Sequence, residues 1–236
     1  MSVMDNVMTT ATSKDWAGGE CFAVLPVGSF EQHGEFLPLV TDSLIAGAIA
    51  ERVSREYDLL LLPPLTFSCS HEHAAYPGTV SISAESLIAI IGDVAASLRR
   101  SGIDRLAIVN GHGGNYVLSN VVQTANADGR RMTLFPARFD WNAARDAAGL
   151  TSTSTEDMHA GELEVSLLLH LHPSLVGSTY SQWDHSSGPR PHLLTAGVAG
   201  YSESGVIGQP SLGTAEKGAA ILNSLTKSFK DHLALF

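Results

Sequence analysis

The feature that most constrains the fold is a series of apolar, strand-like runs with helical patterns between or after most of them. These runs cover residues 21–27, 58–62, 105–109 and 132–136. Their nearly continuous hydrophobicity is typical of parallel strands that are covered on both faces. Because strands that alternate with helices build layered α/β domains, we expect a three-layer α/β/α fold with a mostly parallel central sheet.

Helices are placed by their N-terminal signals and their apolar spacing. Asp42 and Ser83 can each cap a helix whose apolar residues recur three and four positions apart. Further helices are expected at about residues 115–127, 160–170 and 214–233. Residues 180–213 are rich in Gly, Ser and Pro and have little periodicity, which predicts a long loop near a site or an interface.

Composition limits the class of protein. A chain of 236 residues, 44% hydrophobic, can form a single domain, here taken as residues 1–236 with residues 1–19 as an N-terminal extension. A formal charge of -10 without a basic stripe argues against nucleic-acid binding. No run of about 18 apolar residues predicts a membrane span. The only cysteines, Cys21 and Cys69, form no disulfide or zinc pattern, so a reducing cytoplasm is expected.

Polar residues follow two of the expected strands. Glu31 and His33 come after the first, and His112 lies among glycines after the third. Ligand sites in α/β sheets lie beyond the carboxyl ends of the strands, so these groups can converge. Imidazole and carboxylate ligands suit zinc, manganese or iron(II). Asp42 can complete such a site or serve only as a helix cap, and His112 can be a ligand or a loop residue.

A third cluster opens the helix expected at about residue 160. His159 and Glu162 are three positions apart and would share one helical face, as ligand pairs or acid/base pairs do. The alternative is that Glu162 and Glu164 are acids of a solvated first turn, where the helix dipole favours them.

A fourth cluster follows the second strand. His71, Glu72 and His73 precede the turn signal Pro77-Gly78, so they either line the site or belong to a surface turn. The sequence motifs of two other kinds of site, a serine-hydrolase active site and a dinucleotide-binding turn, are missing. The chain lacks the Gly-x-Ser-x-Gly elbow of serine hydrolases, and the run after residue 110 does not match Gly-x-Gly-x-x-Gly.

Taken together, these segments resemble the creatininase (creatinine amidohydrolase) family from about residue 25 to residue 217. The motifs that match, in order, are Pro26-Val27-Gly28-Ser29-Phe30-Glu31-Gln32-His33-Gly34 with Asp42, Glu72-His73 with Tyr76-Pro77-Gly78-Thr79, Asn110-Gly111-His112-Gly113-Gly114-Asn115, His159-Ala160-Gly161-Glu162-Leu163-Glu164 and Thr214-Ala215-Glu216-Lys217-Gly218.

The resemblance implies two metal sites. Glu31, Asp42 and His112 would hold one metal, and His33 with the bridging Asp42 would hold a second. Creatininase has a further glutamate where this chain has Gly114, and Glu162 is expected to replace it. The resemblance also implies a homo-oligomer, with a hexamer as one form, whose contacts residues 188–213 can supply.

The expected reaction is hydrolysis of a non-peptide amide C–N bond in a cyclic amide, a formamide or a small peptide-like substrate. Water activated by one or two divalent ions (Zn, Mn or Fe(II)) would attack the carbonyl carbon. The remaining site residues divide into proton donors for the leaving nitrogen, His159 or Glu164, and the substrate-binding residues Glu72, His73, Gly113, Gly114 and Phe139.

Substrate identity stays open at this stage. Creatininase has tryptophans where this chain has Phe139 and Thr155, which disfavours creatinine itself. The alternatives are a metal-dependent hydrolase or isomerase of a cyclic polyol or keto sugar, and a metal-binding or ligand-binding protein without turnover.

Overall fold

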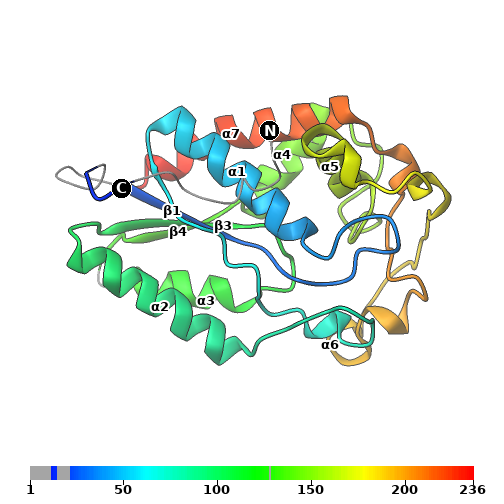
Figure 1. Ribbon diagram of the computed structural model, residues 1–236, viewed down its shortest axis with the longest axis horizontal. Helices are drawn as coiled ribbons and strands as arrows, with labels where there is room; N and C mark the ends of the chain where they lie inside the picture. The colour runs from blue at the N-terminus through cyan, green and yellow to red at the C-terminus, as the bar shows by residue number, and fades with distance from the viewer. Residues whose placement is uncertain (1–11, 15–21, 128) are drawn as a thin grey trace.

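The computed structural model describes residues 12–14, 22–127 and 129–236 (Figure 1). Its centre is a parallel sheet in the order β2-β1-β3-β4. The strands are β1 (Phe22–Val27), β2 (Leu60–Leu61), β3 (Arg105–Asn110) and β4 (Met132–Phe135). The predicted parallel α/β architecture is confirmed, although the second strand is shorter than expected.

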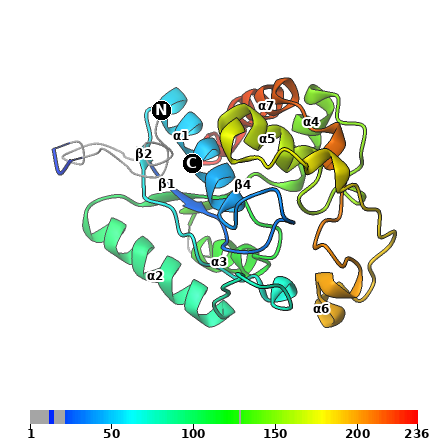
Figure 2. The same cartoon turned by 45° about the vertical axis from the view of Figure 1, so that its right-hand side comes forward.

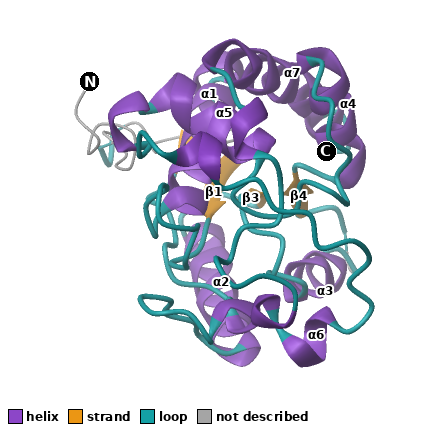
Figure 3. Ribbon diagram, turned by 90° about the vertical axis from the view of Figure 1, so that its right-hand side faces the viewer, coloured by secondary structure: helices purple, strands orange, loops and turns teal. Residues whose placement is uncertain are grey.

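Helices form a layer on each side of the sheet (Figures 1 and 3). One layer contains α1 (Thr41–Tyr57), α4 (Arg138–Ala148), α5 (Glu162–Leu171) and α7 (Ala215–Leu233). The other layer contains α2 (Ala84–Arg100) and α3 (Val117–Ala125). The protein therefore has the three layers that the alternation of strands and helices predicts.

The continuous hydrophobicity of the strands follows from this double cover. In β1, Phe22 and Val24 pack in the core beneath α1 and α7, whereas Ala23, Leu25 and Val27 pack in the core beneath α2 and α3. Successive side chains of a strand point to opposite faces, so both sets must be apolar.

Two helix predictions require correction. Asp42 does not cap α1, because the helix begins at Thr41 and Asp42 lies within its first turn. Helix α4 was not predicted, because its apolar residues are two aromatics and four alanines interspersed with charged residues, without a stripe of large aliphatic side chains. The Ser83 cap of α2 is confirmed, since the Ser83 side chain accepts a hydrogen bond from the Ser86 N–H at 3.2 Å.

Residues 180–213 form the expected long excursion, with only short helical turns such as α6 (Leu193–Ala196). They lie on the same side of the molecule as the loops that leave the carboxyl ends of the strands (Figure 2). Cys21 and most of the expected extension 1–19 fall outside the described residues. Within the described part, no helix is long and apolar enough to cross a membrane.

Candidate metal centre

Two glycines bring the loops after β1 and β3 against the start of α1. A Cβ on Gly28 would overlap the backbone of Ser43, and one on Gly111 would overlap the carbonyl oxygen of Asp42. Only glycine permits so close an approach. As a result, the Asp42 carboxylate lies between the histidines that follow the two strands.

Asp42 is at the centre of the cluster. Its Oδ1 lies 3.1 Å from His33 Nε2, and its Oδ2 lies 2.9 Å from His112 Nδ1. The Ser29 hydroxyl donates to Oδ2 at 2.7 Å and fixes the carboxylate. Glu31 Oε1 is 3.2 Å from His112 Nδ1. Three overlapping ligand sets result: Glu31 with Asp42 and His112, His33 with Asp42 and Glu164, and Glu31 with His33 and His159.

Backbone carbonyls orient both histidines. His33 Nδ1 lies 3.1 Å from the Glu31 carbonyl oxygen, and His112 Nε2 lies 2.9 Å from the Cys69 carbonyl oxygen. When His33 Nδ1 and His112 Nε2 carry the ring proton and donate it to these carbonyls, the other nitrogen of each neutral ring has a lone pair on the side of Asp42. This is the arrangement by which backbone carbonyls orient metal-binding histidines.

The Glu31 carboxylate shows that these residues fit a cation. Its side chain is fully buried, and neither oxygen has a hydrogen-bond partner among the described residues. An ionised carboxylate buried in this way is unstable unless a cation compensates it. The mixture of carboxylate and imidazole ligands suits zinc, manganese or iron(II).

Without a metal, protons compensate part of this negative charge. Burial lowers the pKa of His33, but Asp42, with Glu164 and Glu31, outweighs burial and raises it to about 9. Burial also opposes charge on His112, yet Glu31, Asp42 and Glu72 hold its pKa well above the usual value. The pKa of Asp42 falls well below its usual range, because the histidines outweigh its burial.

Glu164 and His159 reach the cluster from the start of α5. Glu164 Oε2 lies 3.9 Å from His33 Nε2 and accepts a hydrogen bond from the Ala160 N–H at 2.6 Å. Burial raises the pKa of Glu164 to about 8 even though His33 opposes the shift. His159 Nδ1 lies 3.7 Å from Glu31 Oε1. Burial, with His33 and His73, holds the pKa of His159 well below its usual value.

Glu162 lies elsewhere, which corrects its expected role as a metal ligand. Its carboxylate accepts hydrogen bonds from the Ser152 N–H at 3.0 Å and from the Ser152 hydroxyl, and it pairs with Lys217 Nζ at 2.6 Å. Because residues 162 and 164 lie two positions apart on a helix, their side chains point in different directions. Glu164, rather than Glu162, belongs to a group of side chains that could hold a metal.

His73 was predicted to bind substrate, but in the structure it contacts the metal cluster directly. Its Nε2 lies 3.3 Å from Glu31 Oε1, and its Nδ1 lies 2.9 Å from Gln32 Nε2. Gln32 also accepts a hydrogen bond from the Gly34 N–H at 2.9 Å, so it ties His73 to the loop after β1.

Glu72 lies behind His112, with its Oε1 3.4 Å from His112 Nε2. A Cβ on Gly114 would overlap this carboxylate. Glycine at position 114 therefore makes the room that Glu72 occupies, and Glu72 meets the ring edge of His112 opposite to Asp42.

A cavity of about 460 Å³ opens onto the cluster. His112, His159 and Glu164 line it, as do Gly113 and residues of α4. The predicted substrate-binding residue Phe139 does not line this cavity, because its side chain is 78% exposed. Residues Arg138 and Trp141, from the same unpredicted helix, line it instead. Trp141 and the first-turn acid Asp140 are sequence signals by which α4 could have been found.

Known proteins are similar to this chain in sequence and in fold. The creatininase family model, described as creatinine amidohydrolase, matches residues 6–233. A mycofactocin precursor peptide peptidase of Mycolicibacterium smegmatis is 32% identical, over 95% of this chain and 89% of the relative. A creatinine amidohydrolase of Pseudomonas putida is 27% identical, over 68% of each chain. A crystal structure of creatininase superposes with a TM-score of 0.82 at 24% identity, covering 97% of this chain and 96% of that one.

Proposed function

Because this chain belongs to the creatininase family and is a metal-dependent hydrolase of amide C–N bonds, we propose that it cleaves a small peptide-like amide at a two-metal centre. The observation that carries the proposal is the pair of ligand sets that share Asp42. A shared carboxylate can bridge two ions, and paired ions are common in hydrolases.

The two ligand sets support an assignment of the metal sites. Glu31, Asp42 and His112 would hold one ion, and His33, Asp42 and Glu164 would hold the second. Each set places its ligand atoms within 4.8 Å of one another. Zinc, manganese and iron(II) all suit these ligands, and selection among them depends on supply as well as on geometry.

A bound divalent ion supplies Lewis acidity, which activates water and polarises the amide carbonyl. The protein's own residues position the reactants and move the proton. His159 lines the cavity, and its Nε2 lies 2.6 Å from the Gln32 carbonyl oxygen, to which it donates. Its Nδ1 is left as an acceptor that can take a proton from water and return it to the leaving nitrogen. The Gly113 N–H, also at the cavity, can donate to the developing oxyanion.

A peptide-like substrate is favoured over creatinine. The relative at 32% identity is named for a precursor peptide. The cavity volume is within the range of about 300–1,000 Å³ that is usual for small-molecule sites. The Phe139 side chain, at a position where creatininase has an aromatic pocket residue, points to the surface.

The test is hydrolysis by protein loaded separately with zinc, manganese and iron(II). The substrate panel contains creatinine, N-formylglycine, and short peptides with free and amidated ends, and products are identified by mass spectrometry. We expect hydrolysis of a peptide or acylated amino acid and none of creatinine. Turnover of creatinine alone would overturn the substrate assignment.

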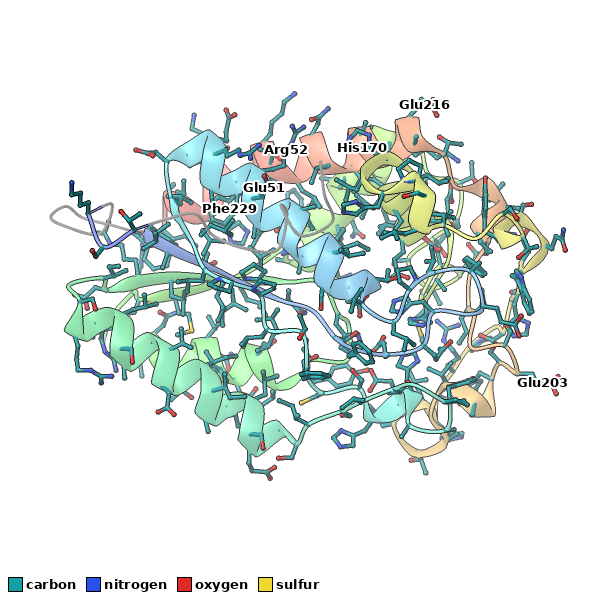
Figure 4. The ribbon with its side chains drawn as sticks, in the orientation of Figure 1. Glu51, Arg52, His170, Glu203, Glu216 and Phe229 are labelled. Atoms are coloured by element: carbon teal, nitrogen blue, oxygen red, sulfur yellow. The ribbon has the colours of Figure 1, made fainter. Side chains whose placement is uncertain are left out.

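A pair of variants tests the role of His159. His159→Gln should retain the bound metal and lose turnover by about a hundredfold or more, the usual scale of a missing acid/base group. The control is His170→Gln, on the exposed part of α5 and labelled in Figure 4. Unchanged turnover in His159→Gln would remove it from the mechanism.

The assembly and location are also proposals. We propose a homo-oligomer, with a hexamer as one form, in which residues 188–213 contribute contacts. Leu194 in this stretch is 82% exposed, and burial of such a side chain would stabilise an interface. A stable monomer in size-exclusion chromatography would overturn the proposed homo-oligomer.

A single domain and a cytoplasmic location remain predictions from the sequence.

A further inference from the structure

We propose that Arg138 binds an anionic group of the amide substrate, a carboxylate or a phosphate, while the amide lies at the metal centre. This inference rests on the proposed function, because it assigns part of the substrate of the same cavity. It adds a specificity-determining residue and a charge requirement to that function.

The cavity joins the metal cluster to one face of α4. Arg138, Trp141, Asn142 and Arg145 line it together with His112, His159 and Glu164. The four α4 positions follow the spacing i, i+3, i+4 and i+7, so they form a single helical face. A molecule that fills the cavity therefore contacts both the cluster and this face.

The two arginines of this face differ in their partners. Arg145 is buried, pairs with Asp157 at 2.9 Å and donates to the Ser152 carbonyl oxygen at 2.6 Å. Arg138 is exposed and makes no hydrogen bond or ion pair with the part of the chain that the structure describes. The positive charge of Arg138 is thus available to a ligand, whereas that of Arg145 is used within the fold.

The nearest acid of the same turn is already engaged. Asp140 Oδ2 accepts a hydrogen bond from the Ala137 N–H at 2.8 Å and lies 3.0 Å from His232 Nε2. His232 Nδ1 in turn lies 2.8 Å from Thr133 Oγ1 on β4. These contacts hold the first turn of α4 against the sheet, so the backbone that presents Arg138 is anchored while its side chain is free.

The positive charge of Arg138 favours binding of an anionic substrate at the cavity. The chain has a formal charge of -10, which repels anionic substrates as a whole. A guanidinium that lines the reaction cavity offsets this repulsion locally and can bind carboxylate or phosphate through two parallel hydrogen bonds. A cation in the first turn of a helix is also disfavoured by the dipole, so the position does not serve the helix itself.

The first experiment measures binding, independently of turnover. Zinc-loaded protein is titrated calorimetrically with N-acetylalanine, N-acetylalaninamide and N-acetyl-phosphoethanolamine. We expect at least tenfold tighter binding of one or both anions than of the neutral amide. The two anions separate carboxylate from phosphate as the preferred group. Equal affinities for all three in wild type would overturn the proposal.

Variants assign the preference to Arg138 rather than to the metal. Arg138→Gln should lose most of the discrimination between anion and neutral amide, and Arg138→Lys should retain part of it. Arg100→Gln, an exposed arginine on the opposite helical layer, is the control and should bind as wild type. Discrimination that is unchanged in Arg138→Gln would also overturn the proposal.

Turnover separates this inference from the proposed function. If a peptide is hydrolysed, Arg138→Gln should raise KM for the anionic substrate with a smaller effect on kcat. If nothing on the panel is hydrolysed, the proposed function fails, but the calorimetric comparison still decides whether Arg138 selects anions.

Discussion

Two buried acidic clusters meet at the start of α5 and behave in opposite ways. In one, the oxygens of Glu31 have no hydrogen-bond partner within the described residues. In the other, Glu162 and Asp157 are paired with Lys217 and Arg145. The first cluster retains free ligand atoms for a cation, and the second has its cations built into the chain.

One short segment supplies both clusters. His159 and Glu164 face the metal cluster, whereas Asp157 and Glu162 face the paired network. Asp157 also accepts a hydrogen bond from the Leu163 N–H at 3.1 Å, which anchors the start of α5. The network thus holds the helix that presents Glu164. The difference shows that burial alone does not identify an acid as a ligand, because a cation of the fold can neutralise a buried acid, as Lys217 does for Glu162.

The largest expected effect follows from removing the shared ligand. Asp42→Asn should lose both metal ions and reduce turnover on the order of a thousandfold or more, because a neutral amide compensates neither ion. Metal content by elemental analysis and turnover check this, with Glu216→Gln on the exposed start of α7 as control (Figure 4). Retention of two metal equivalents would refute the bridging role.

The paired network should respond in stability rather than in metal content. Glu162→Gln should lower the free energy of unfolding by about 3 kcal/mol, because it leaves Lys217 without its buried partner. Denaturant unfolding measures this. Glu164→Gln is the matched variant and should lose one metal equivalent instead. If Glu162→Gln lost metal and Glu164→Gln retained it, Glu162 and not Glu164 would be the ligand.

Metal removal sharpens the contrast. Zinc at about 100 times its dissociation constant should raise the free energy of unfolding of the metal-free protein by about 2.7 kcal/mol for each site that it fills, through preferential binding to the folded state. Thermal unfolding with and without a chelator measures the difference. Glu31→Gln should greatly reduce it, since it removes a buried carboxylate that accepts no hydrogen bond from the described residues. An equal metal effect in Glu31→Gln would contradict the assignment.

The smallest effect concerns Glu72, which contacts the outer edge of His112. Glu72→Gln should weaken metal binding by about tenfold, the low end of what groups behind a metal ligand contribute. Competition with a chelating dye measures the affinity. Glu85→Gln, nearby at the start of α2, is the control. An unchanged affinity would show that Glu72 does not support the metal site through His112.

Much of the fold and part of the site were predictable from the sequence. The strand runs and the glycines beside Glu31 and His112 indicated a parallel sheet with the site at its carboxyl edge, and the structure has this sheet. These features are local, since periodicity of two or 3.6 residues and the need for glycine are written into short segments. Helix α4 lacked such a signal, so Arg138 and Trp141 were missed as cavity residues.

Other features were decided only by the tertiary structure. In the motif from His159 to Glu164, residue types alone do not distinguish an acid that faces a metal cluster from one that faces Lys217, which is 55 positions away from Glu162. The same holds for Phe139, whose exposure depends on the direction in which α4 packs. The sequence thus determined which groups are available for chemistry. Long-range packing decided which of them retain unpaired atoms, because partners that satisfy a buried charge come from distant segments.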